Sequence, residues 1–98
     1  MKVCWTPESK ITYLKILAYL DESWSQRELQ NFVDTVENVI NQIIDEPYMF
    51  GASPKKKNIR KGFVTKHTTL YYRIKPGEKE IELLTFWDNR QNPDRLAY

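Results

Sequence analysis

The chain has 98 residues, 41% of them hydrophobic and 29% charged, which predicts a single folded domain over residues 1–98 and excludes a disordered chain. No apolar run is long enough to cross a membrane, no secretory signal is visible, and the lone Cys4 suits a reducing compartment, so we expect a cytoplasmic protein. One His and one Cys cannot form a metal site, and three glycines form no nucleotide-binding loop, so no metal or cofactor is expected.

The net charge of +2 is unevenly distributed. Residues 1–53 contain four basic and eight acidic side chains, whereas residues 54–98 contain eleven basic and five acidic ones. The basic half indicates an anionic partner, either a nucleic acid or an acidic peptide, although a solvated basic face would give the same composition.

The first half of the chain predicts a short strand, Lys2–Trp5, and two helices. Thr6 is an N-cap residue before Pro7, and helical spacing continues to about Glu22. The apolar face expected for this helix comprises Ile11, Leu14, Leu17 and Ala18, widened by Tyr13, Ile16 and Leu20.

Ser25 and Glu28 form a capping box that starts the second helix, and Pro47 ends it. Its apolar seam consists of Leu29, Phe32, Val33, Val36, Val39, Ile40, Ile43 and Ile44. The connection between the helices is short, so they should form an antiparallel hairpin that packs on a sheet.

Three runs rich in β-branched and aromatic residues, 59–66, 69–75 and 80–88, predict that sheet. They are separated at His67-Thr68 and at 76–79, where Gly77 is expected to take the positive φ of a turn. Pairing Arg73 and Lys75 with Glu82 and Glu80 sets the register. The same register places Leu70, Tyr72 and Ile74 beside Ile81, Leu83 and Trp87 on the core face. It leaves Tyr71, Leu84 and Phe86 on the opposite face, which the chain's own terminus or a partner must cover.

Basic side chains and a terminal tyrosine are the candidates for chemistry. Metal-free phosphodiester cleavage needs cations at the scissile phosphate and groups that transfer protons. The residues that could supply this, or equally could hold an acidic peptide, are Lys56, Arg60, Lys61, Lys66, Arg73, Arg90 and Tyr98. His67 is interpreted as a turn residue rather than a catalytic one.

The order of these segments resembles the RelE/ParE superfamily of bacterial type II toxins, over nearly the whole chain. The pieces that carry the resemblance are Val3–Lys10, the proline after Asp45-Glu46, the basic Lys57–Lys61, the strand Thr69–Ile74, which is similar to the family's "LVYRV" strand, and the segment Glu80–Arg90. The resemblance implies an α+β fold, with an antiparallel helix hairpin packed on a small, mainly antiparallel four-stranded sheet.

The resemblance also implies a toxin that is neutralised by a cognate antitoxin. RelE-type members cut mRNA on the ribosome without a metal, whereas ParE-type members inhibit DNA gyrase. By position, Lys66 or Lys61, Arg90 and Tyr98 would match the residues of the ribonucleases, but Asp88 and Asn89 replace the His or basic residues of many of them.

The well-capped hairpin is similar to ParE-type chains, so a ParE-like toxin is the preferred hypothesis. A RelE-like endonuclease and a non-toxic protein-binding module of the same fold are the alternatives. For the partner surface we expect Lys56, Arg60, Lys61, Tyr71, Arg73, Leu84 and Phe86 to contribute.

Overall fold

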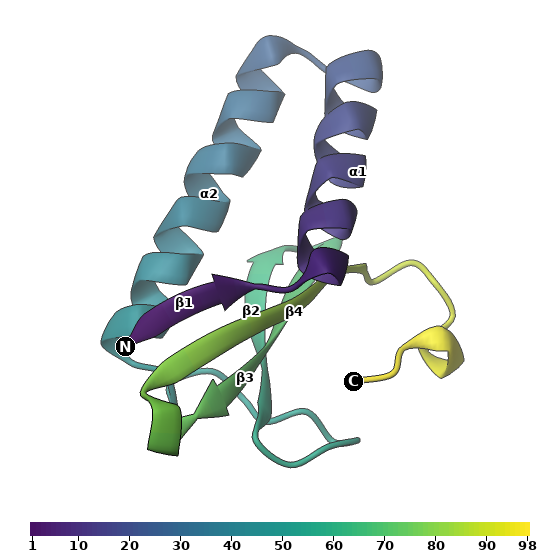
Figure 1. Cartoon of the computed structure of the whole chain (residues 1–98). Helices are drawn as coiled ribbons and strands as arrows, with labels where there is room; N and C mark the ends of the chain where they lie inside the picture. Colours follow the sequence, from purple (N-terminus) through teal and green to yellow (C-terminus); the bar gives the residue numbers. More distant parts are fainter.

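The computed structural model describes residues 1–98 and consists of a helix hairpin on one face of a four-stranded sheet (Figure 1). In chain order the elements are β1 (Lys2–Trp5), α1 (Pro7–Ser23), α2 (Gln26–Asp45), β2 (Ile59–Thr65), β3 (Thr68–Lys75) and β4 (Glu80–Asp88). A short 3-10 turn, Pro76–Glu78, lies between β3 and β4, and a second one, Pro93–Arg95, lies after β4. The predicted order of elements and the α+β class are confirmed. Neither helix is long and apolar enough to span a membrane.

Both predicted helix caps are present. The Thr6 hydroxyl accepts a hydrogen bond from the Ser9 amide at 3.1 Å, and the Ser25 hydroxyl accepts one from the Glu28 amide at 3.3 Å. Such caps satisfy amides that the first turn of a helix leaves without a partner. Helix α2 ends at Asp45, just before Pro47, as expected.

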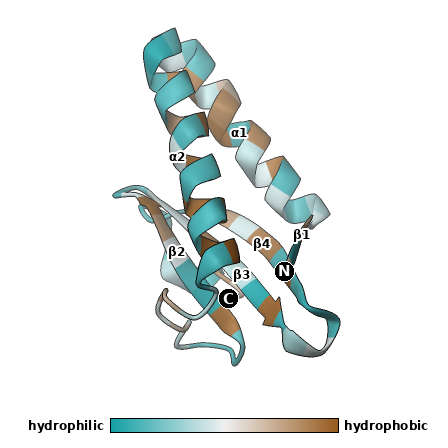
Figure 2. Ribbon diagram, turned by 90° about the vertical axis from the view of Figure 1, so that its left-hand side faces the viewer, coloured by the Kyte–Doolittle hydropathy of each residue, from teal (hydrophilic) through white to brown (hydrophobic).

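The strands lie in the order β1-β4-β3-β2, and only the β1–β4 pair is parallel. Helix α1 contacts the inner strand β4 and α2 contacts the edge strand β2, so the two helices lie over different parts of the sheet. The main core joins the buried side of α2 to the facing strands. Its buried members are Phe32, Val36, Val39, Ile43, Val64, Leu70, Tyr72, Ile74, Ile81, Leu83 and Phe86. Figure 2 shows the corresponding hydrophobic bands on the strands and hydrophilic residues along much of α2.

A glycine in β2 lets α2 approach the sheet closely. A Cβ atom at Gly62 would lie 3.4 Å from Val39 Cγ1 and 3.6 Å from Ile43 Cδ1. A larger side chain there would push α2 away from the strand, because the core has no space to spare.

The predicted register of β3 and β4 is correct at one end and wrong at the other. Arg73 pairs with Glu82 and Lys75 with Glu80, but Tyr71 pairs with Thr85 while Tyr72 pairs with Leu83. Leu84 is therefore an extra residue in β4, a β-bulge.

The bulge inverts the alternation of side chains beyond it. Phe86 is only 3% exposed and faces the helices, 5.6 Å from the Trp5 ring and 5.1 Å from the Tyr13 ring. Trp87 lies on the opposite face, where it packs against a separate cluster that contains Leu84. The sequence predicts the reverse faces for Phe86 and Trp87, because strict alternation does not allow for an inserted residue.

Two threonine hydroxyls, one at the N-cap of α1 and one inside the helix, bind backbone groups in the bulged part of β4. Strand β1 ends at Trp5, opposite Leu83, so it cannot pair with the rest of β4. The Thr6 hydroxyl donates to the Leu83 carbonyl at 2.8 Å, and the Phe86 amide donates to the Thr12 hydroxyl at 3.0 Å. Backbone groups that would otherwise be buried without partners are thereby satisfied.

Helix α1 is less buried than the sequence predicted. Tyr13, Ile16, Leu17 and Leu20 pack against the core, but Ile11, Leu14 and Ala18 are exposed. The hairpin extends well beyond the sheet (Figure 1), so its outer side has nothing to pack against. The expectation that these three residues belong to the core is wrong.

The turns also differ from the expected ones. The β2–β3 turn is Lys66-His67, and Thr68 already belongs to β3. No glycine has a positive φ; the left-handed residues are Asn58 and Lys79. Gly77 lies instead inside the 3-10 turn, and the chain reverses at Lys79, with φ of 50° and ψ of 45°.

Candidate functional site

The sheet face opposite the helices, here called the tail face, is covered by the chain's own C-terminal residues. Ile59, Tyr71 and Leu84 form its buried cluster, and Trp87, Leu96 and Tyr98 pack against them. The sequence allowed two covers for this face, the chain's own terminus or a partner, and in the structure the terminus covers it. Tyr71 and Leu84, two of the expected partner contacts, are thus buried beneath this cover, and Phe86 lies on the other face of the sheet.

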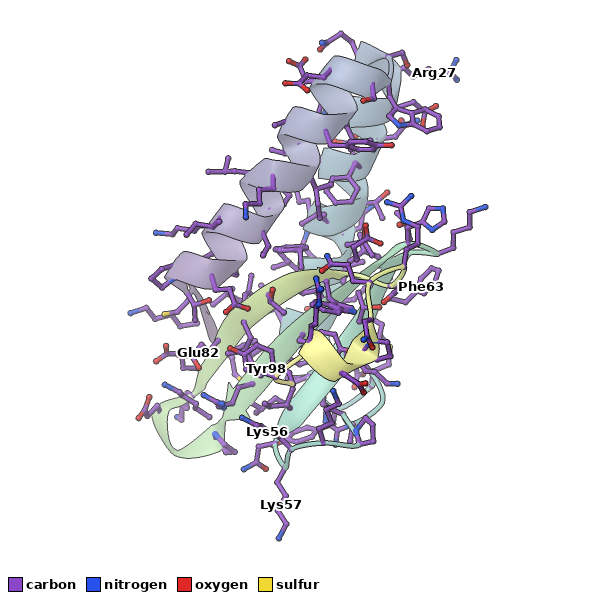
Figure 3. The ribbon with its side chains drawn as sticks, turned by 90° about the vertical axis from the view of Figure 1, so that its right-hand side faces the viewer. Arg27, Lys56, Lys57, Phe63, Glu82 and Tyr98 are labelled. Carbon is purple, nitrogen blue, oxygen red and sulfur yellow. The ribbon has the colours of Figure 1, made fainter.

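Three side chains, those of Ser53, Lys55 and Lys56, contact this C-terminal tail. Lys55 Nζ donates to the carbonyl oxygens of Pro93 at 2.7 Å and Leu96 at 2.8 Å. The Ser53 hydroxyl donates to the Tyr98 carbonyl, and Lys56 Nζ lies 5.8 Å from the centre of the Tyr98 ring (Figure 3). Burial raises the pKa of the Tyr98 hydroxyl, which makes it a weaker acid. Tyr98 therefore has a structural position in the tail.

Two arginines among the expected partner residues are occupied within the chain. Arg73 Nη1 lies 3.0 Å from Glu82 Oε1, and Lys75 Nζ lies 3.6 Å from the other oxygen of Glu82. Arg60 Nη1 donates to the carbonyl oxygens of Tyr48 at 3.2 Å and Phe50 at 2.6 Å, which ties the loop after α2 to β2. Lys56 and Lys61, by contrast, are exposed and form no ion pair.

A cleft of about 750 Å³ lies between the hairpin and the end of the sheet that carries the β2–β3 turn. We call it the hairpin cleft; the residues that define it are Lys15, Tyr19, Trp24, Lys66, His67 and Arg90. Two of the three predicted catalytic residues, Lys66 and Arg90, thus line one cavity. His67, interpreted as a turn residue, lies exposed in the β2–β3 turn and borders the same cavity.

The arginine of the hairpin cleft, Arg90, is already paired with a carboxylate of the same chain. Arg90 donates to both carboxylate oxygens of Asp88, through Nε at 3.0 Å and Nη2 at 2.9 Å. These bonds hold the pKa of the Asp88 carboxyl below its usual range and raise the pKa of the Arg90 guanidinium. The pair is neutral as a whole, whereas Lys66 and Lys15 line the same cleft and form no ion pair.

Tyr98 lies outside the hairpin cleft. It borders a smaller hollow of about 290 Å³ between the start of α1 and the C-terminal tail, which neither Lys66 nor Arg90 lines. The three residues that the sequence grouped as catalytic candidates are thus divided between two cavities. No cluster of three or more His, Cys, Asp or Glu side chains could hold a metal ion.

Sequence reasoning missed the aromatic side of the hairpin cleft. Tyr19 is 50% exposed and Trp24 is 56% exposed, and both line the cavity together with Lys15. Trp24 stands directly before the cap residue Ser25, and Tyr19 has no distinguishing neighbour in the sequence. Only the folded chain brings both side chains to the same cavity as the β2–β3 turn.

Comparison with known proteins identifies the fold. Neither a family model nor a curated protein matches the sequence. Among solved structures, the chain is similar to the "Chromosomal ParDE TA system from P. aeruginosa", with a TM-score of 0.64, 15% identity and coverage of 90% of this chain and 95% of the other. It is also similar to the "YoeB/ParE toxin from Agrobacterium tumefaciens", with a TM-score of 0.63, 16% identity and coverage of 91% and 99%. At such low identity the agreement concerns the arrangement of the backbone: this chain has the RelE/ParE toxin fold.

Proposed function

We propose that this chain is the toxin of a type II toxin–antitoxin pair, that a cognate antitoxin neutralises it, and that it inhibits growth by binding a target such as DNA gyrase. The toxin assignment is supported by the likeness to two solved structures whose descriptions name ParDE and YoeB/ParE toxins, each covering nine tenths of this chain or more.

The observation that favours binding over RNA cleavage is the separation of the catalytic candidates. A metal-free ribonuclease needs cations and proton-transferring groups around one phosphate. Here Tyr98 borders a different cavity from Lys66 and Arg90, its hydroxyl is a weakened acid, and Arg90 is neutralised by Asp88. An inhibitor that works by binding does not need cations and proton-transferring groups around one phosphate.

One observation favours the second candidate, a RelE-like endonuclease. Lys66, His67 and Arg90 border the same cleft, and a histidine can transfer protons near neutral pH. In that case a phosphate would have to compete with Asp88 for Arg90, and His67 would take the part that the sequence assigned to Tyr98.

The test is to induce the chain in bacterial cells and to measure growth, plasmid supercoiling and the positions of new mRNA 5′ ends. We expect growth arrest with altered supercoiling and no new cuts. Tyr98→Phe should remain toxic, because a binding inhibitor transfers no proton. Removal of basic residues should weaken toxicity gradually.

A nuclease would behave differently under the same assay. Loss of one well-placed cation costs roughly 10²–10³-fold in rate, so Lys66→Ala or Arg90→Ala would abolish arrest. Lys57→Ala is the matched control, because this lysine points into solvent away from both cavities (Figure 3). New mRNA cuts at codon boundaries with unchanged supercoiling would overturn the proposal.

A further inference from the structure

The strand and turn residues that line the hairpin cleft include one acidic side chain, Asp88, beside the basic Lys66 and Arg90. Asp88 is the last residue of β4. The next residue, Asn89, ties the end of β4 to the β2–β3 turn, because its amide donates to the His67 carbonyl at 2.8 Å and its side chain donates to the Lys66 carbonyl at 3.3 Å. These bonds hold Asp88 and the basic turn at the same end of the cleft.

The Asp88 carboxylate occupies the guanidinium of Arg90. Its two oxygens accept from Nε and Nη2, and Oδ1 also accepts the Arg90 backbone amide at 2.9 Å. The pair thus uses the Nε–Nη2 edge of the guanidinium, which is an edge that can bind two oxygens of a phosphate at once. The Arg90 side chain is 57% exposed, so this edge would be accessible to a ligand if the carboxylate were absent.

The same carboxylate repels any anion that enters the cleft. The bonds from Arg90 hold the pKa of Asp88 below its usual range, so the group is ionised at neutral pH. Lys66 and Arg90 bring two positive charges to this end of the cleft, and Asp88 cancels one of them. Neutralisation of phosphates is the sequence-independent source of affinity for nucleic acids. Asp88 therefore acts against a nucleic acid strand more than against a neutral ligand.

We propose that Asp88 is a specificity-determining residue: by pairing with Arg90 it excludes single-stranded RNA from the hairpin cleft. The inference rests on the proposed function for the kind of activity, which is binding rather than RNA cleavage, and on the geometry of Asp88 for the mechanism. The basic half of the chain attracts nucleic acids without regard to sequence. A chain that acts on another target needs a residue that opposes this attraction in its cleft.

The test is a gain of affinity in the purified full chain. A short fluorescent oligouridine is titrated with each variant, and binding is followed by fluorescence anisotropy. Asp88→Asn removes the charge, but its side-chain oxygen can still accept the Arg90 amide, so the turn should persist. Oligouridine should bind at least tenfold more tightly, because a hydrogen bond between charged groups has roughly that effect on affinity. The slope of log K against log salt should be steeper by about 0.7, since one more phosphate is neutralised.

Matched variants separate the pairing with Arg90 from the net charge. Asp94→Asn removes the same charge from an exposed residue that lines neither cavity, so it should leave the affinity nearly unchanged. Arg90→Ala in the Asp88→Asn chain should abolish the gain. Asp88→Ser is made in parallel and should show the same gain, because serine also accepts backbone amides in turns and carries no charge. Circular dichroism checks that each variant is folded.

Four results would overturn the inference: no gain in either Asp88 variant, an equal gain in Asp94→Asn, a gain that survives Arg90→Ala, or tight binding or cleavage of oligouridine by the parent chain. All four are measured with purified protein, without reference to growth. A chain that gains affinity on loss of Asp88 but arrests no growth would refute the proposed function and leave the role of Asp88 standing.

Discussion

Replacing Thr12 with valine tests whether a helix hydroxyl completes the sheet. In the folded chain the Thr12 hydroxyl accepts the Phe86 amide at 3.0 Å and donates to the Glu8 carbonyl at 2.8 Å. Valine keeps the shape of the side chain but removes both bonds. The Phe86 amide would then be a buried donor without a partner, which costs about 1–3 kcal/mol.

Thr35→Val is the matched control. Thr35 donates to the Asn31 carbonyl at 2.8 Å, the same bond along its own helix, but it accepts nothing from the sheet. Its loss should change the free energy of unfolding by no more than about 0.5 kcal/mol. The difference between the two variants therefore isolates the bond to β4.

The assay is thermal unfolding combined with amide hydrogen exchange. For a domain of this size Thr12→Val should lower the melting temperature by roughly 4–24 °C, since the cost is about 1–3 kcal/mol and 1 kcal/mol corresponds to about 4–8 °C. Exchange at the Phe86 amide should be faster than in the Thr35→Val chain. Equal melting temperatures for the two variants would refute the reasoning and mean that water replaces the hydroxyl at no cost.

Three further predictions concern the core, pH and the C-terminal tail. Val36→Asp buries an unpaired charge beneath α2 and should unfold most of the population, as seen by circular dichroism; an unchanged melting temperature would mean that α2 does not lie on the sheet. Burial raises the pKa of Tyr72 to about 12, above its unfolded value of about 10, so this residue stabilises the fold below pH 10 and loses that contribution as pH rises towards 12. Tyr72→Phe removes its hydrogen bond to the Pro47 carbonyl and should make denaturant midpoints less sensitive to pH in that window; identical pH profiles would count against the assignment. Lys55→Ala removes two bonds to the tail and should speed proteolysis after Arg95, whereas Lys57→Ala should not, and equal rates would contradict the anchoring role.

The elements could be predicted because their signals are local. Caps at Thr6 and Ser25, the stop at Pro47 and the alternation of Tyr72, Arg73 and Ile74 each depend on a few neighbouring residues. The paired charges of Arg73 and Glu82 fixed one register because a slip of one residue would have buried them.

The errors have a common physical origin in tertiary geometry. The inserted Leu84 exchanges the faces of Phe86 and Trp87, and no residue type announces a bulge. Ile11 and Leu14 have helical spacing, but burial depends on what lies opposite, and both side chains are more than half exposed in the folded chain.

The candidate site was predicted less well than the fold. The basic residue types were identified from sequence, but their partners were not, because Arg60 binds loop carbonyls and Arg90 binds Asp88 only in the folded chain. The separation of Tyr98 from Lys66 likewise depends on the path of the last ten residues across the sheet.

The parallel pairing of β1 with β4 has a consequence for how the chain folds during synthesis. Lys2 aligns with Glu80 and Trp5 with Leu83, so the first strand has no partner until residues 80–83 have been made. Contacts between residues so distant in sequence form slowly, because the chain loses the entropy of a long loop before these contacts stabilise the fold. At about 5–20 residues per second, a ribosome takes several seconds to synthesise the residues between these two strands, and the apolar sides of both helices remain without their sheet throughout. A nascent chain of this topology is therefore open to chaperones, proteases and early-binding partners until β4 emerges, because the sheet is complete only then.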